Sequence, residues 1–253
     1  MEEQFSELVI RLSKAKKIFV ITGAGISAES GIPTFRGKDG WWKNNDPMKL
    51  ASPEGFAENP QLVWEWYNYR KRMIRESSPN QGHITLAEME KYYPHFLLAT
   101  QNVDRFHQRA GSKNVAEIHG TIVTSRCTKC TKQYSDEEKP TDIEPLPRCD
   151  CGGLLRPDVV WFGELLPQEP LQKIDLFLRS SPGVDVAFVI GTSALFQYIQ
   201  NWAHICVSEG AFLVEINLEP TSISSFATAS FFDKSGKFLP VLWREVRKYV
   251  TFE

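Results

Sequence analysis

The sequence lacks the features that mark membrane, secreted and nucleic-acid-binding proteins. None of its apolar runs reaches the roughly 18 residues that a membrane-spanning helix requires. The start, Met1-Glu2-Glu3-Gln4, is acidic and lacks the basic and apolar regions of a secretory signal. Lysine and arginine total 29 against 31 aspartate and glutamate, without the basic excess of a dedicated nucleic-acid binder. We therefore expect a cytoplasmic monomer with neither nucleic-acid nor membrane partners.

Cysteine is also scarce. The chain of 253 residues has five cysteines, and four of them cluster between residues 127 and 151. This number is too small for a disulfide scaffold, so a reducing compartment and a bound metal are the better interpretation. The 42% hydrophobic and 24% charged residues are typical of a folded globular protein with a sizeable core.

Short apolar runs that end in Gly, Thr, Asn or Gln alternate with helical patterns along the chain. This alternation predicts an α/β fold with an open parallel Rossmann-like sheet and helices on both faces. Ligands of such sheets bind beyond the carboxyl ends of the strands. We expect strands at residues 18–22, 96–100, 114–118, 184–190 and 211–217, and helices at 61–75 and 199–209.

The stretch from Cys127 to Cys151 is different, because it is polar, rich in proline and without helical or strand periodicity. It reads as a small inserted module. We expect three parts: a discontinuous Rossmann-like domain, a loop with a helical insertion, and a small four-cysteine module. The Rossmann-like domain comprises residues 1–36, 81–120 and 155–253. The loop with its helical insertion comprises residues 37–80, and the four-cysteine module comprises residues 121–154.

A glycine-rich loop follows the first strand. The run Gly23-Ala24-Gly25-Ile26-Ser27-Ala28 satisfies the pattern G-x-G-x-x-[G/A]. The first glycine permits a tight turn and the second lets the backbone approach a pyrophosphate at a helix N-terminus. A purely structural turn is the alternative. No strand with an acidic residue follows about 20 residues on, so hydride transfer is disfavoured.

The loop from Gly23 to Arg36 resembles the signature loop of the sirtuins, the NAD-dependent protein-lysine deacylases. The resemblance covers residues 15–243 and implies NAD as co-substrate and acyl-lysine proteins or peptides as partners. Further sirtuin-like blocks occur in the expected order, namely Thr100-Gln101-Asn102-Val103-Asp104, Ile118-His119-Gly120, the four cysteines, Val159-Val160-Trp161-Phe162-Gly163-Glu164, Gly191-Thr192-Ser193 and Glu215-Ile216-Asn217.

The resemblance also implies the binding residues, although asparagines and aspartates after strands also occur as simple capped turns. The implied NAD-binding residues are Gly23, Ala24, Gly25, Ser27, Ala28, Thr34, Phe35, Arg36, Trp42, Gln101, Asn102, Asp104, Gly191, Thr192, Ser193, Asn217, Leu218, Glu219 and Ser235. The implied substrate-binding residues are Tyr67, Arg70, Val160, Trp161, Phe162, Gly163 and Glu164.

His119 is the candidate catalytic residue among five histidines. It follows an expected strand at the ligand-binding edge, and an imidazole is a natural general base near neutral pH. A packed or surface imidazole is the alternative. In sirtuins the matching histidine activates a ribose hydroxyl. The acyl oxygen attacks the ribose carbon that bears nicotinamide, and the products are nicotinamide, free lysine and 2′-O-acyl-ADP-ribose.

The four clustered cysteines form two close pairs, Cys127-x-x-Cys130 and Cys149-x-Cys151. Two such pairs joined by a loop fit a tetrahedral zinc site, and a site with four sulfur ligands is structural. Disulfides are the alternative in an oxidising compartment. A nucleic-acid-binding zinc ribbon is disfavoured, because acidic residues balance the nearby basic ones. The fifth cysteine, Cys206, lies in an apolar helical pattern and is expected in the core.

Tyr67 and Arg70 are the candidate acyl anchor. They are three residues apart on an expected helix and so share a face. Arginine pairs bidentately with carboxylates, and a tyrosine hydroxyl adds a further hydrogen bond. The pair resembles the class III sirtuins, which remove succinyl, malonyl and glutaryl groups, and Thr34 replaces an aspartate that many sirtuins have. A solvated arginine beside a core tyrosine is the alternative.

The stretch Ala194-Leu195-Phe196-Gln197-Tyr198-Ile199 departs from the family, because many sirtuins have a Val-x-Tyr-Pro-like sequence there and this chain lacks the proline. Peptide recognition is therefore expected to differ. The predicted function is NAD-dependent removal of succinyl, malonyl or glutaryl groups, and also of acetyl groups, from protein lysines. The alternatives are an NAD hydrolase or ADP-ribosyltransferase of the same fold, a non-catalytic NAD-sensing module, and an interaction protein built on the zinc module.

Overall fold

The computed structural model describes residues 2–36, 40–141 and 146–250. Residues 37–39 of the expected cofactor loop and 142–145 of the expected zinc module lie outside the described residues, as do residues 1 and 251–253. None of the helices within the described ranges is long and apolar enough to cross a membrane.

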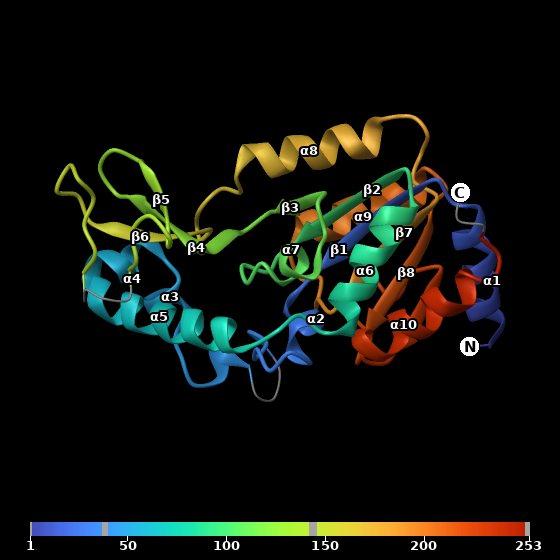
Figure 1. Ribbon diagram of the computed structural model, residues 1–253, viewed down its shortest axis with the longest axis horizontal. Helices are drawn as coiled ribbons and strands as arrows, with labels where there is room; N and C mark the ends of the chain where they lie inside the picture. The colour runs from blue at the N-terminus through green and yellow to red at the C-terminus, as the bar shows by residue number, and fades with distance from the viewer. Residues whose placement is uncertain (1, 37–39, 142–145, 251–253) are drawn as a thin grey trace.

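A six-stranded parallel sheet forms the larger part of the molecule (Figure 1). The strand order is β3-β2-β1-β7-β8-β9, so the expected open parallel α/β sheet is confirmed. No expected strand corresponds to β9, because four residues at a sheet edge give no distinct apolar run. The strands are β1 (Lys17–Thr22), β2 (His95–Thr100), β3 (Val115–Glu117), β7 (Val186–Ile190), β8 (Phe212–Asn217) and β9 (Ala229–Phe232).

Helices cover both faces of this sheet, as expected. Successive side chains of a strand point to opposite faces, which explains why β1 is apolar throughout. Ile18 and Val20 belong to a core cluster with three helices, α1 (Glu2–Lys14), α6 (Gln81–Tyr92) and α10 (Ser235–Val246). Phe19 and Ile21 belong to the opposite cluster with α8 (Gln168–Arg179) and α9 (Gln197–Ser208), which also buries Cys206.

A second, smaller part contains an antiparallel sheet in the order β5-β4-β6 and lies at one end of the molecule (Figure 1). A third core cluster joins its strands to the α4 and α5 helices. The elements are α3 (Pro47–Leu50), α4 (Pro53–Glu58), α5 (Pro60–Glu76), β4 (Gly120–Cys127), β5 (Gln133–Ser135) and β6 (Leu155–Val159).

These short strands differ from the sequence-based expectation. The stretch 127–151 was expected to contain no strand, yet β5 lies within it. The expected boundary of the zinc module at residue 154 precedes β6, although β6 pairs with β4 in the smaller sheet. Strands of three to eight residues beside prolines and cysteines carry too little periodicity to be recognised.

The carboxyl ends of the central strands lie at one edge of the parallel sheet. Thr22 of β1 is in register with Thr100 of β2 and Ile190 of β7. The loops after these strands therefore meet. They include the short helices α2 (Ala24–Ala28) and α7 (Phe106–Ala110), and the 3₁₀ helix η1 (Trp41–Lys43) lies further along the chain.

Candidate active site

A cleft of about 1360 Å³ opens at this edge, between the parallel sheet and the smaller part. It exceeds the usual size of a pocket for one small ligand, so it has room for a dinucleotide and a side chain together. The cleft gathers residues expected from the sequence, and these are Gly23, Ala24, Gly25, Ala28, Thr34, Phe35, Arg36, Trp42, Tyr67, Arg70, Gln101, Asn102, His119, Val160, Trp161, Phe162, Gly163, Glu164, Gly191, Thr192, Ser193, Asn217, Leu218, Glu219 and Ser235.

Two of the expected NAD-binding residues, Ser27 and Asp104, are not among the residues that line the cleft. Both are buried, and the Ser27 hydroxyl donates to the Asp104 carboxylate at 2.7 Å. Asn102, which does line the cleft, donates from Nδ2 to the Gly23 carbonyl at 3.0 Å and to Ser27 Oγ at 3.2 Å. Ser27 and Asp104 thus support the cleft wall from behind. Sequence spacing alone does not separate such a support from a lining residue.

The glycine-rich loop packs against the loop after β7. The Gly25 amide donates to the Gly191 carbonyl at 2.7 Å, and a Cβ on Gly25 would lie 2.7 Å from the Gly191 Cα. Gly191 has a φ of +60°, a conformation that favours glycine. Glycine at position 25 is therefore required by the neighbouring loop, a reason that differs from the expected approach of a pyrophosphate.

Gln101 joins the same two loops from β2. Its Nε2 donates to Thr192 Oγ1 at 2.9 Å, and its backbone carbonyl accepts from His119. The loop after β8 contributes Asn217, whose Nδ2 donates to the Thr192 carbonyl at 3.3 Å. These contacts fix the polar wall of the cleft before any ligand is present.

His119 lies immediately before β4 with its imidazole at the cleft. Nδ1 is 2.9 Å from the Gln101 carbonyl, and Nε2 is 2.6 Å from the Tyr198 hydroxyl. A carbonyl only accepts, so Nδ1 carries the proton and Nε2 has the free lone pair. Burial lowers the pKa of His119 to about 4, against a smaller opposing effect of the Gln101 hydrogen bond. The imidazole is therefore neutral at pH 7.

Sequence reasoning missed several lining residues. Tyr198 and Phe196 stack with ring centroids 5.4 Å apart, and Phe196 also contacts the His119 ring edge-to-face. Glu29 accepts from the Gly236 amide at 2.8 Å, beside Ser235. The sequence placed the loop after β7, which precedes Tyr198, at the ligand-binding edge. It gave no sign that Tyr198 contacts His119, which lies 79 residues away in the chain.

The other end of the cleft holds Arg70, on α5. This helix begins at Pro60 after an Asn59 cap that accepts from the Leu62 amide. Arg70 is 6% exposed, and its guanidinium lies over the rings of Phe35, Trp66 and Tyr67 at 5.0, 4.6 and 5.5 Å. Within the described part of the chain it has neither a hydrogen bond nor an ion pair. The buried Asp104 carboxylate attracts this charge without pairing with it directly. A buried cation without a direct ion pair is costly, so the site is suited to an anion.

Tyr67 adds a donor to this end of the cleft. Its hydroxyl accepts from Trp161 Nε1 at 2.9 Å, so its own proton remains available. Burial raises the pKa of Tyr67, which keeps the hydroxyl protonated. Ala51, a small residue, also lines the cleft.

The segment from Val160 to Glu164 connects this end to His119. The Val160 amide donates to the His119 carbonyl at 2.9 Å. Glu164 is held in a structural role, because its carboxylate accepts from Arg156 at 3.0 Å and from the Trp161 amide at 2.9 Å. Glu164 lines the cleft, but these bonds occupy its carboxylate.

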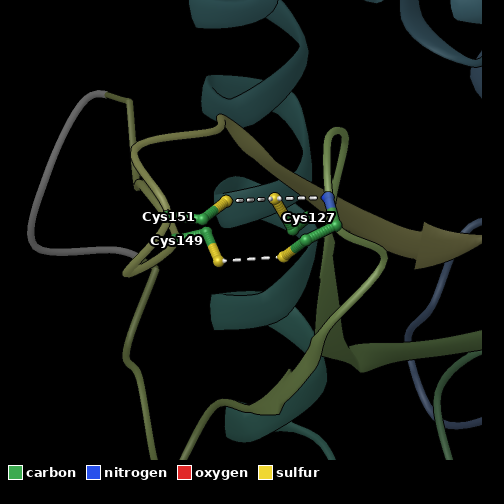
Figure 2. A group of neighbouring side chains, drawn as sticks. Cys127, Cys149 and Cys151 are labelled. Carbon is green, nitrogen blue, oxygen red and sulfur yellow. Dashed lines mark hydrogen bonds between the residues drawn. The ribbon is translucent and has the colours of Figure 1, made fainter.

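The four cysteines converge at the far side of the smaller sheet. Their sulfurs lie within 4.8 Å of one another, and the sulfur of Cys127 faces that of Cys151 (Figure 2). The distances between sulfurs, 3.5 Å for Cys127 to Cys151 and for Cys130 to Cys149, are too long for disulfides. They are close to the about 3.8 Å that tetrahedral Zn–S bonds produce. The cluster is therefore consistent with a structural zinc ion.

The loop that follows Cys149 and Cys151 packs closely against the cluster. A Cβ on Gly153 would lie 2.7 Å from the Cys127 sulfur, so only glycine fits without displacement. The Cys127 sulfur also accepts from the Lys129 amide at 3.3 Å, which suits a thiolate ligand.

This combination of parallel sheet, glycine-rich cleft, central histidine and four-cysteine module defines the class of the protein. Residues 23–197, more than half of the chain, match the model of the Sir2 family. The chain belongs to the Sir2 family.

Similar proteins cover nearly the whole chain. The chain is 44% identical over 246 residues to NAD-dependent protein deacylase 1 of Archaeoglobus fulgidus, across 97% of this chain and 99% of that protein. A crystal structure of a Sir2 homologue in complex with NAD has a TM-score of 0.90 and 42% identity, covering 97% of this chain and 95% of that one. A Sir2–p53 peptide–NAD⁺ structure has a TM-score of 0.82 and 33% identity, covering 95% and 98%.

Proposed function

We propose that the protein is an NAD-dependent protein-lysine deacylase that prefers acidic acyl groups such as succinyl, malonyl and glutaryl. The observation that carries this proposal is one cleft with a neutral imidazole in its wall and, at its end, a buried guanidinium that forms no ion pair with the described residues. Membership of the Sir2 family and the deacylase name of the archaeal relative support the NAD-dependent deacylation. The environment of Arg70 supports the acyl preference.

NAD as co-substrate supplies a ribose carbon that releases nicotinamide and a hydroxyl that takes over the acyl group. The glycine-rich loop, the Gln101–Asn102 block, the loop after β7 and the loop after β8 would hold it. Ser27 and Asp104 would act from behind by fixing Asn102. All the residues expected from the sequence to bind NAD thus keep a part in binding, and that of Ser27 and Asp104 is indirect.

His119 is proposed as the general base. Its bond to the Gln101 carbonyl holds the proton on Nδ1, so Nε2 is the atom that accepts a proton from a ribose hydroxyl. Its lowered pKa means that the accepting form dominates at physiological pH.

Arg70 and Tyr67 are proposed to bind the carboxylate of the acyl group. The guanidinium is held by three aromatic rings and has its hydrogen-bond donors unused within the described residues. An incoming carboxylate would neutralise the buried charge and accept from both side chains. An acetyl group makes no such contact, and it would still fit a pocket built for longer chains.

The experiment offers the protein NAD and matched lysine peptides carrying succinyl, glutaryl, malonyl, acetyl or no acyl group, and follows peptide mass. We expect NAD-dependent loss of the acyl group, with kcat/KM at least about tenfold higher for succinyl than for acetyl. A higher value for acetyl would refute the acyl preference. NAD loss with unchanged acyl-peptides would indicate an NAD hydrolase or ADP-ribosyltransferase, and NAD binding without turnover would indicate a sensing module.

We also propose the discontinuous division into a Rossmann-like domain, a cofactor loop with helical insertion, and a zinc module, acting as a monomer in the cytoplasm. None of the five cysteines, all of which lie in the described part of the chain, forms a disulfide, which fits a reducing compartment.

A further inference from the structure

Tyr198 forms a hydrogen bond with His119 and has no part in the proposed chemistry. It lies in the first turn of α9, in the stretch where this chain departs from the family pattern. Its hydroxyl is 2.6 Å from His119 Nε2. Because Nδ1 is protonated toward Gln101, this hydroxyl is the donor and the lone pair of Nε2 is the acceptor.

The tyrosine ring is braced on both sides. It stacks on Phe196 with an interplanar angle of 9°, and its centroid lies 5.5 Å from that of Trp202. Phe196 in turn contacts the His119 ring and lies under the Arg36 guanidinium at 5.5 Å. Burial raises the pKa of Tyr198, so its hydroxyl stays protonated and remains a donor.

We propose that Tyr198 is a positioning residue that occupies the base atom of His119 when no cofactor is bound, so that NAD has to displace the tyrosine hydroxyl. This inference rests on the proposed role of His119. The hydroxyl fills the place that a ribose hydroxyl requires, since both must donate to the same lone pair. The tyrosine hydroxyl therefore competes with the co-substrate for this lone pair.

The direct test is the variant Tyr198→Phe, which keeps the stacked ring and removes only the competing hydroxyl. We expect the Kd for NAD, measured by calorimetry, to fall by about 2- to 10-fold, the net worth of one neutral hydrogen bond. The KM for NAD should fall in parallel, and kcat should change by less than about twofold. Tyr249→Phe, at a 70% exposed position away from the cleft, is the matched control and should change neither.

A double-mutant cycle asks whether Tyr198 acts through the histidine. In a His119→Ala background, Tyr198→Phe should leave the Kd for NAD unchanged, because the competition no longer exists. An unchanged or raised Kd in the single variant would overturn the proposal. The same decrease in Kd in both backgrounds would also overturn it, as would a collapse of kcat at constant KM.

The binding measurements are independent of turnover, so the two proposals fail separately. Wild-type protein that binds NAD but deacylates none of the peptides would refute the proposed function, while the two Kd comparisons would still decide the role of Tyr198. Wild-type protein that does not bind NAD would refute both.

Discussion

Arg70 offers the sharpest test of acyl selectivity. The variant Arg70→Met keeps an unbranched side chain among Phe35, Trp66 and Tyr67 and removes the charge. A hydrogen bond to a charged group contributes about 1.5–3 kcal/mol, and a bidentate contact adds a second. At about 1.4 kcal/mol per decade, the loss of one or both bonds should lower kcat/KM for a succinyl-peptide by about 10- to 10⁴-fold.

The assay compares steady-state kcat/KM on matched succinyl- and acetyl-peptides. Acetyl turnover should change little, because an acetyl group has no carboxylate to pair with Arg70. Arg72→Met is the control, because Arg72 is exposed on the same helix and does not line the cleft. Equal losses on both peptides would mean that Arg70 only supports the fold, and no loss on either would refute the anchor.

Two further predictions concern the zinc cluster and the base. Cys127→Ser should release the metal and lower Tm by roughly 10 °C, since metal binding is coupled to folding; calorimetry and a metal assay check this. A metal assay that finds no zinc in freshly purified wild-type protein would contradict the four-cysteine zinc site. With a His119 pKa of about 4, kcat/KM for NAD should stay nearly flat from pH 8 to pH 5. An unperturbed histidine would lose about 30-fold at pH 5, and such a loss would refute the buried neutral base.

The α5 helix links the zinc cluster to the acyl end of the cleft. Lys71 Nζ donates to Asp136 at 2.7 Å and to Thr141 Oγ1 at 2.7 Å, and Asn68 donates to the Thr141 carbonyl. Both partners lie in the chain between the two cysteine pairs. A zinc ion bound by the four cysteines would therefore stabilise the segment that holds the helix carrying Tyr67 and Arg70.

The sequence was informative where one residue type has few structural uses. The apolar run at 18–22 is buried on both faces, and only a central parallel strand has that environment. The positions of His119 and Gln101 after expected strands placed each of them at the ligand-binding edge, because the carboxyl ends of parallel strands share an edge. The spacing of the four cysteines predicted that they cluster, because two close pairs joined by a loop fit one tetrahedral metal site.

Other features depend on contacts between distant residues and carry no local signal. The short strands of the smaller sheet form because β4 and β6 pair across more than 25 residues. Ser27 and Asp104 look like loop residues in sequence, and only the packing of α2 against the Asn102 loop buries them. The contact between Tyr198 and His119 arises because two separate loops end at the same sheet edge.

The central claim, NAD-dependent deacylation with His119 as the base, is tested most directly by the stoichiometry of one reaction. Wild-type protein and His119→Ala are incubated with NAD and a succinyl-peptide, and nicotinamide, free-lysine peptide and O-succinyl-ADP-ribose are quantified together. We predict equal amounts of the three products from wild type and a loss of about 10²-fold or more in the variant, with NAD binding retained. Nicotinamide release without free-lysine peptide, or near-wild-type turnover in the variant, would contradict the claim.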